Sequence, residues 1–181
     1  MKKQSVYALV LSSLLAAVSV VLTQFLSFYV PFLGNNSVRI GLGHVPLLLA
    51  GLLLGPFWGA ATGAVADIVG ATLFPFGGSY FPGFTVTAML TGLLPALLKK
   101  PLLPDSKQLR FVWLRLLLVV LITETLASIL VNTFWLSFMY GMDYVATLLM
   151  RLPVTLCMCA VYSAVIYPLY SRISREITRF R

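Results

Sequence analysis

Long apolar runs are the feature that most constrains the fold of this chain. Residues 7–33 carry no charged side chain, and residues 111–138 and 144–170 carry only one or two each. A helix that crosses the hydrocarbon core of a bilayer needs about 20 predominantly apolar residues. Because 60% of the 181 residues are hydrophobic and 10% are charged, too little polar surface remains to cover a soluble globule. We therefore expect one integral membrane domain over residues 1–181.

Shorter apolar segments lie between the first run and the last two. Residues 45–54 are too short to cross a membrane alone, and extending them back through residues 37–44 gives a short, tilted or broken helix. The sequence Gly-Pro-Phe at 55–57 predicts a tight turn into a helix over 58–73, and residues 84–98 follow as a fourth helix. With the long runs, these segments predict an all-α bundle of six transmembrane helices.

Eleven of the 13 lysine and arginine residues gather in three clusters at the ends of these segments. Cytoplasmic segments of membrane proteins are enriched in lysine and arginine. If all three clusters are cytoplasmic, both termini are cytoplasmic and the number of crossings is even, which favours six over five. This topology accounts for the net charge of +8 without a nucleic-acid partner. The clusters are Lys2 and Lys3; Lys99, Lys100, Lys107, Arg110 and Arg115; and Arg172, Arg175, Arg179 and Arg181.

Motifs for chemistry or energy coupling are missing from the sequence. It contains no phosphate-binding Gly-x-x-x-x-Gly-Lys-Ser/Thr loop, no His-Glu-x-x-His and no Gly-x-Ser-x-Gly. We therefore expect no enzymatic activity, no metal site and no cofactor. Binding or transport remains, and uphill transport would draw its energy from a partner or an ion gradient.

Two carboxylates lie within apolar segments, where an ionisable group costs about 2.5–3.5 kcal/mol unless it is paired or solvated. Asp67 either makes an interhelical hydrogen bond, or pairs with Arg39 or Arg151, or forms the floor of an outward-facing cavity; we favour the cavity. Glu124 shares an i, i+4, i+8 stripe with Ser128 and Asn132. That stripe either joins helices or contacts a ligand.

An aromatic loop, PFGGSYFPGFT at residues 75–85, is set between two of the predicted helices. Its rings, with Trp135, either grip a flat ligand or belong to the interfacial aromatic belt. Arg39 and Arg151 are candidate cations near the outer face, where each either binds a carboxylate or extends toward lipid headgroups. His44, shortly before Pro46, is interpreted as a helix-entry residue.

The segment ADIVGATLFPFGGSYFPGFTVTAMLTGLL, residues 66–94, resembles the corresponding region of folate-specific S components of energy-coupling factor (ECF) transporters. The resemblance implies a subunit of a prokaryotic plasma membrane that captures folate from outside. It further implies a transmembrane coupling subunit and two cytoplasmic ATPases that drive release inward. Small residues of the first helix at four-residue spacing, Ala8, Ser12 and Ala16, match the pattern by which such components dock the coupling subunit.

A pterin presents its exocyclic amine and the adjacent ring nitrogen as two parallel donors, which one carboxylate accepts together. Asp67 is the residue predicted for that role, and Asp67→Asn is expected to weaken folate binding by roughly an order of magnitude or more. Thr85 and Asn132 would add hydrogen bonds, and Arg39 or Arg151 would pair with the ligand's glutamate end. The aromatic contacts would be Phe74, Tyr80, Phe81, Phe84 and Trp135.

Two other interpretations stay open. The chain could be an S component for another flat vitamin, of the riboflavin or thiamin class. A cationic ligand, however, would leave Arg39 and Arg151 without an anionic partner. From a different class, it could be an ion-coupled carrier or a structural membrane protein, which would need no ATPase partner.

Overall fold

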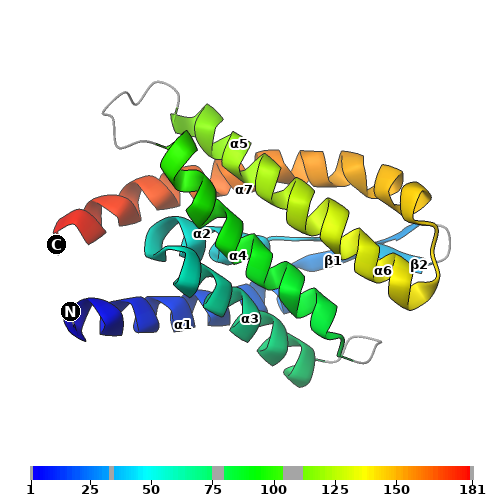
Figure 1. Ribbon diagram of the computed structural model, residues 1–181, viewed down its shortest axis with the longest axis horizontal. Helices are drawn as coiled ribbons and strands as arrows, with labels where there is room; N and C mark the ends of the chain where they lie inside the picture. The colour runs from blue at the N-terminus through cyan, green and yellow to red at the C-terminus, as the bar shows by residue number, and fades with distance from the viewer. Residues whose placement is uncertain (1, 33–34, 75–79, 104–111, 180–181) are drawn as a thin grey trace.

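A computed structural model describes residues 2–32, 35–74, 80–103 and 112–179 of the chain. For residues 2–4, 29–32, 35–39 and 174–179 it describes the backbone only. The helices in these ranges lie side by side in an elongated bundle, and both chain ends lie at the same end of it (Figure 1). The prediction that the chain is essentially all-α is confirmed.

The helices are α1 (Lys2–Phe25), α2 (His44–Leu54), α3 (Pro56–Leu73), α4 (Pro82–Leu102), α5 (Val112–Glu124), η2 (Thr125–Val131), α6 (Asn132–Tyr140) and α7 (Tyr144–Arg179). The segments α5, η2 and α6 follow one another without a break, and η2 is a π-helical stretch inside that rod. By length and composition, three spans of the described residues could cross a membrane: Ser5–Phe25, Val112–Tyr140 and Tyr144–Ile173.

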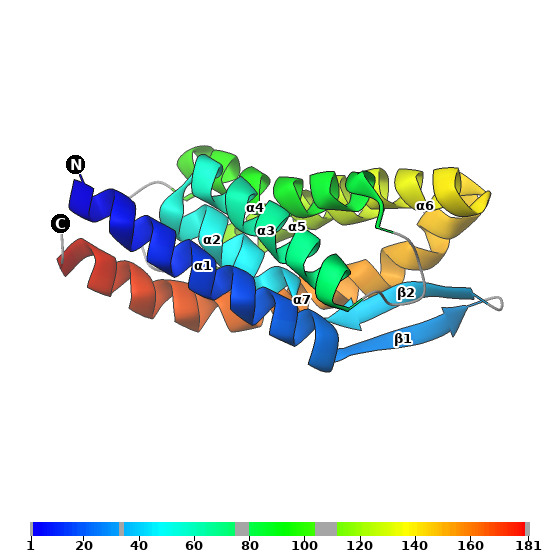
Figure 2. The same cartoon turned by 90° about the horizontal axis from the view of Figure 1, so that it is seen from below.

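A β-hairpin replaces part of the predicted helical structure near the N-terminus. The strands β1 (Ser27–Phe32) and β2 (Asn35–Gly41) pair antiparallel and lie along α7 at the far end of the bundle from the termini (Figure 2). The prediction of a helix through residue 33 is therefore wrong beyond Phe25, and the backward extension of the second helix is wrong as well. The SFYVPF segment is rich in aromatic and β-branched residues, which favour strands, and Pro31 falls where the pairing register shifts.

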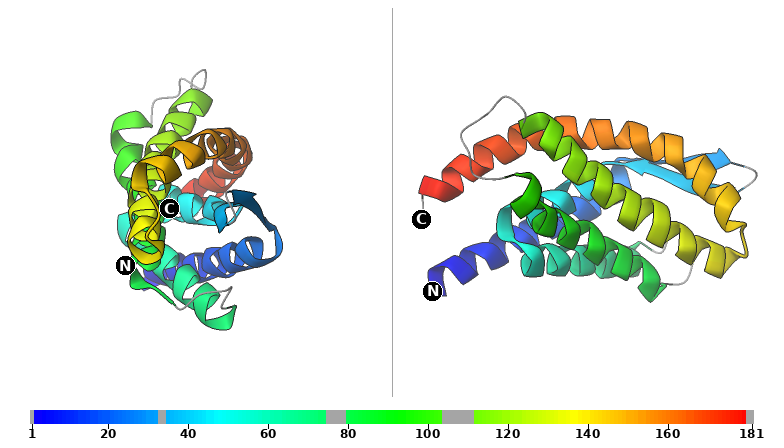
Figure 3. Two further views of the ribbon diagram at one scale, coloured as in Figure 1. Left: turned by 90° about the vertical axis from the view of Figure 1, so that its right-hand side faces the viewer. Right: turned by 45° about the horizontal axis from the view of Figure 1, so that its top comes forward.

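The short helix α2 lies at the centre of the core. Its 11 residues span about 16 Å, and eight of them are buried. Val45, Leu48, Leu49 and Leu52 pack with residues of α5 and α7, so this helix is enclosed by the helices around it (Figure 3). Gly55, with a positive φ of 97°, turns the chain directly into α3, and Pro56 opens that helix as the Gly-Pro-Phe sequence predicted.

Glycines hold α2, α3 and α4 in close backbone contact. A Cβ atom added at Gly59 of α3 would collide with the carbonyl oxygen of Gly92 in α4 and would lie 2.8 Å from Cα of Gly51 in α2. A Cβ at Gly63 would meet the backbone of Ala88 in the same way. These small residues therefore fix the spacing of the three helices, as is common in membrane bundles.

Gly59→Leu is expected to separate these helices and to lower the midpoint of thermal unfolding in detergent by about 5 °C or more. Val65→Leu, at a half-exposed position of the same helix, is the matched control and should change the midpoint little. Equal midpoints for the two variants would contradict the close packing described for Gly59.

Candidate functional site

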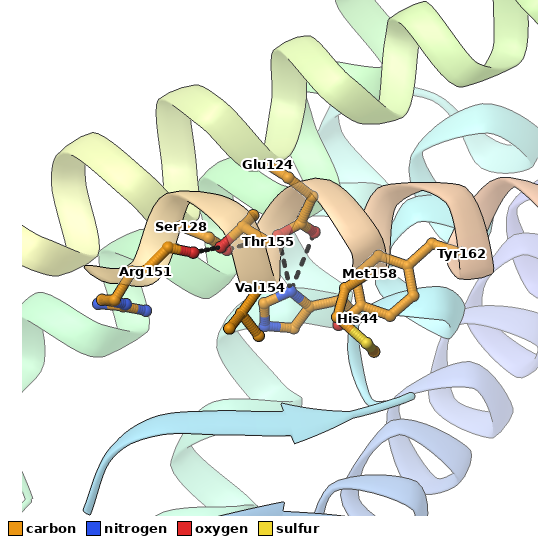
Figure 4. Close-up of a pocket in the computed structure, with 8 residues that line it drawn as sticks. All are labelled: His44, Glu124, Ser128, Arg151, Val154, Thr155, Met158 and Tyr162. Carbon is orange, nitrogen blue, oxygen red and sulfur yellow. Dashed lines mark hydrogen bonds and ion pairs between the residues drawn. The ribbon is translucent and has the colours of Figure 1, made fainter. Parts of the chain in front are cut away.

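A buried carboxylate at the end of α5 is the centre of a polar cluster. Glu124 is 1% exposed, and its Oε1 and Oε2 lie 3.0 Å and 3.2 Å from Nδ1 of His44, which donates to it (Figure 4). The hydroxyl of Ser128 donates to Oε2 at 2.6 Å. The cluster thus joins α2, α5 and η2, and it supplies the partners that a carboxylate needs in an apolar environment.

Arg151 of α7 is a buried cation that lies beside the same cavity as Glu124. It is 9% exposed, its Nη1 donates to Thr133 of α6 at 3.3 Å, and its Nε has no hydrogen-bond partner within the described residues. In Figure 4 its guanidinium group lies apart from Glu124, with Val154 and Thr155 of α7 between them. A buried donor without a partner is a group that a bound ligand or water can satisfy.

The cluster borders a cavity of about 40 Å³. This volume holds a small number of water molecules, since one water needs roughly 10–15 Å³ measured this way. The cavity offers an acceptor at Glu124, donors at Arg151 and hydroxyls between them. Its lining residues are His44, Glu124, Ser128, Arg151, Val154, Thr155, Met158 and Tyr162.

The π-helical stretch η2 explains which residues of the predicted stripe face this cavity. The Glu124 and Ser128 side chains meet as the i, i+4 spacing predicted. A π-helix bonds i to i+5 and turns less per residue than an α-helix, so the predicted alignment of Asn132 is lost and it does not line the cavity. Thr133 instead reaches Arg151. Such stretches often occur at functional sites.

The end of the β-hairpin is fastened to the same region. The hydroxyl of Tyr162 in α7 donates to the carbonyl oxygen of Gly41 at 2.8 Å, and Ser19 of α1 donates to that of Gly43 at 2.7 Å. His44 follows directly and begins α2. The residues that link the hairpin to the bundle therefore lie beside the Glu124 carboxylate.

Asp67 lies in a second polar group, between α3 and α4. Thr85 donates to its Oδ2 at 2.6 Å, and because that bond uses the only hydroxyl proton of Thr85, the Tyr80 hydroxyl donates to Thr85 at 2.7 Å. The carboxylate is partly buried and is not among the residues that line the cavity. This arrangement makes the interhelical hydrogen bond that was the alternative interpretation of Asp67.

Most of the predicted aromatic contacts gather near that second group. Phe81 stacks edge to face with Phe84 at 5.7 Å and with Trp135 at 5.5 Å between ring centroids. Gly83 permits this, since a Cβ there would lie 2.6 Å from the Trp135 ring. The indole nitrogen of Trp135 is buried without a hydrogen-bond partner in the described part of the chain. Phe74 lies elsewhere and pairs with Phe25 of α1 at 6.3 Å.

The predicted site residues thus fall into separate groups. The structure brings Asp67, Tyr80 and Thr85 together with the aromatic rings beside them, and it places Arg151 with Glu124. The Arg39 side chain and residues 75–79 of the aromatic loop lie outside the described residues. Sequence reasoning missed His44 as a partner of Glu124, and only its position as the single histidine before an apolar helix could have drawn attention to it.

The predicted docking stripe of the first helix faces inward. Ala8, Ser12 and Ala16 are 9%, 7% and 4% exposed, and Ala16 packs against Leu47 of α2 and Ala66 of α3. Direct contact between this stripe and a partner therefore requires α1 to shift relative to its own bundle. Docking through these residues stays a prediction.

A helical bundle with long apolar spans and a buried polar cavity defines a membrane protein of a binding or transport class. The family model described as "ECF-type riboflavin transporter, S component" matches residues 3–175. The chain therefore belongs to this family of ECF-type S components, which are transporter subunits and not enzymes.

Similar proteins agree on this fold. A relative named "Folate transporter FolT" from Clostridium novyi (strain NT) is 29% identical over 175 residues, which cover 97% of this chain and 93% of the relative. The structure described as "Crystal structure of FolT bound with folic acid" is 31% identical, with a TM-score of 0.72 over 91% of this chain and 92% of that one. "Structure and mechanism of the S component of a bacterial ECF transporter" is 26% identical, with a TM-score of 0.71, covering 96% and 98%.

Thr85→Val should destabilise the ligand-free protein, because it leaves the partly buried Asp67 carboxylate and the Tyr80 hydroxyl without their shared partner at a cost of about 1–3 kcal/mol. Thr85→Ser should restore most of the thermal stability. Thr87→Val is the matched control, since within the described residues the Thr87 hydroxyl donates to the Gly83 carbonyl of its own helix and not to a neighbouring helix. An equal loss in Thr87→Val and Thr85→Val would contradict a special role for the Asp67–Thr85 bond.

Proposed function

We propose that this chain is the folate-capturing subunit of an ECF-type transporter. The observation that carries the proposal is the similarity to FolT bound with folic acid, at 31% identity over about nine-tenths of both chains. The Clostridium novyi relative, named a folate transporter, supports it over almost the whole sequence. The chain takes folate from the outer side of a prokaryotic plasma membrane and delivers it inward when it is coupled to its partners.

The second candidate ligand is riboflavin, because the family model that matches is named for a riboflavin transporter. Thiamin is disfavoured because it is a cation. The buried Arg151 guanidinium beside the cavity would have no anionic partner in such a ligand. Neither alternative changes the class of protein, and a direct titration separates them.

Six membrane crossings with both ends cytoplasmic form part of the proposal. Both termini lie at one end of the bundle (Figure 1), and basic residues flank both the first and the last helix. The short helix α2 then counts as a crossing that is completed by the hairpin before it. Membership of the S-component family implies a coupling subunit and two ATPases that supply the energy, and the lack of a nucleotide-binding motif in the sequence is consistent with this.

We keep the ligand contacts proposed from the sequence, and we separate those that lie together in the structure from those that lie apart. The proposed wall of the site consists of the hydrogen-bonded group Asp67, Thr85 and Tyr80 and of the ring cluster Phe81, Phe84 and Trp135. Arg151, or Arg39 from the hairpin, pairs with an anionic or acceptor group of the ligand. Phe74 and Asn132 remain proposed contacts that stand apart from this wall and from the cavity, respectively.

The purified chain in detergent should bind folic acid one to one without ATP or partners. We expect it to bind folic acid at least about tenfold more tightly than riboflavin or thiamin, because a site built for particular hydrogen bonds rejects ligands that leave those groups unpaired. Isothermal titration calorimetry with the three vitamins measures this. Tighter binding of riboflavin would replace folate by the second candidate, and no binding by folded protein would favour an ion-coupled carrier.

Partner assembly is tested separately. When the tagged chain is isolated in mild detergent from its native membrane, a transmembrane coupling subunit and two ATPase subunits should be recovered with it. Ala16→Leu, in the inward-facing stripe, is expected to reduce that recovery if α1 shifts to expose the stripe. Purification of the chain without any ATPase would contradict the coupling proposal and leave the folate titration unaffected.

A further inference from the structure

The position of the Glu124 carboxylate would allow its two oxygens to accept two parallel hydrogen bonds. One nitrogen, Nδ1 of His44, lies between its two oxygens, at 3.0 Å and 3.2 Å. Ser128 occupies one further position on Oε2. An ionised carboxylate has about four acceptor positions. A group with two adjacent N–H donors could therefore take the place of the single histidine nitrogen.

His44 is the exposed member of this pair. Its side chain is 39% exposed, whereas that of Glu124 is 2% exposed. His44 also stands at the junction between the β-hairpin and α2, three residues after Gly41. A side chain at the surface and at a joint between elements can move away, but a carboxylate enclosed in the bundle cannot lose its partner without a replacement.

The cavity beside the His44–Glu124 pair is also lined by a buried cation with an unsatisfied donor. The Arg151 side chain is nine-tenths buried, lines the same cavity and keeps an unpartnered Nε within the described residues. A ligand that enters there meets a carboxylate that only accepts and a guanidinium that only donates (Figure 4). It must offer N–H donors at one end and an acceptor atom at another.

We infer that Glu124 recognises the 2-amino-4-oxo-pyrimidine edge of the ligand, and that His44 occupies the place of this edge in the ligand-free chain. The inference rests on the proposed function and assigns the role predicted for Asp67 to a different carboxylate. Asp67 already accepts from Thr85 and does not line the cavity. Pockets for ligands of this size enclose about 300–1,000 Å³, so binding requires the cavity of about 40 Å³ to widen beyond the space that His44 vacates.

This assignment also predicts selectivity between the two candidate vitamins. The pterin edge carries an amine and a ring N–H side by side, which match two carboxylate oxygens. The corresponding edge of the riboflavin ring carries one N–H between two carbonyl oxygens, and a carboxylate repels those carbonyls. Glu124 therefore selects folate by leaving riboflavin with an unfavourable acceptor pair.

The first test compares the affinities of variants for folic acid by calorimetry. Glu124→Gln should weaken binding by about tenfold or more, and by more than Asp67→Asn, since it loses the two-donor, charge-assisted pair. Asp143→Asn, an exposed carboxylate that caps the first turn of α7, is the matched control. His44→Ala should bind folic acid as tightly as the wild type or more tightly, because it removes the competing group.

Two results would overturn the inference. One is a loss in Asp67→Asn that exceeds the loss in Glu124→Gln; the other is a loss of tenfold or more in His44→Ala, which would make His44 a ligand contact. If Glu124→Gln does not fold, a loss of tenfold or more in His44→Ala still overturns the inference. Wild-type affinity for folic acid tests the proposed function alone, and the ratios between variants test this inference alone.

A second readout uses the fact that the chain contains one histidine. In protein labelled with ¹⁵N-histidine and carrying no histidine tag, the imidazole signals report directly on the bond to Glu124. Saturating folic acid should move these signals away from their ligand-free positions, because the bond to the Glu124 carboxylate is broken. Unchanged signals with folic acid bound would show that His44 keeps Glu124 and would overturn the inference.

Discussion

The pairing of a buried carboxylate is the interaction on which the central part of this structure depends. Glu124 lies among buried residues that are mostly apolar or hydroxyl-bearing, and at 1% exposure it cannot be solvated by bulk water. Its partners must therefore come from the chain itself or from a ligand. His44 and Ser128 supply them here, and this need fixes the start of α2 against the rod formed by α5 and η2.

The short helix α2 connects the buried Glu124 carboxylate to the rest of the fold. It is too short to cross a bilayer, and the hairpin β1–β2 precedes it. Close contacts at Gly51, Gly59 and Gly92 bind α2 to α3 and α4, while its leucines pack on α5 and α7. The helix α2 is therefore held tightly between its neighbours. Its first residue, His44, lines the cavity and follows the hairpin in the chain.

Much of this arrangement could be predicted from single residues, and the failures have physical causes. The turn at Gly55, the helix after Pro56 and the Glu124–Ser128 pair follow from local spacing. The strand Ser27–Phe32 could not be separated from the helix before it, because an apolar run without charges has no period that distinguishes the two. The contact between His44 and Glu124 joins residues 80 positions apart, and the π-helical stretch that turns Asn132 away has no local sequence signal.

The most direct measurement is an experimental structure of the chain with folic acid bound. We expect the exocyclic amine and the ring N–H of the pterin to lie within about 3.2 Å of the two Glu124 oxygens. His44 Nδ1 should then lie beyond hydrogen-bond distance from that carboxylate, with the start of α2 and the end of β2 displaced. A pterin held by Asp67, with the His44–Glu124 pair intact at about 3 Å, would contradict the account.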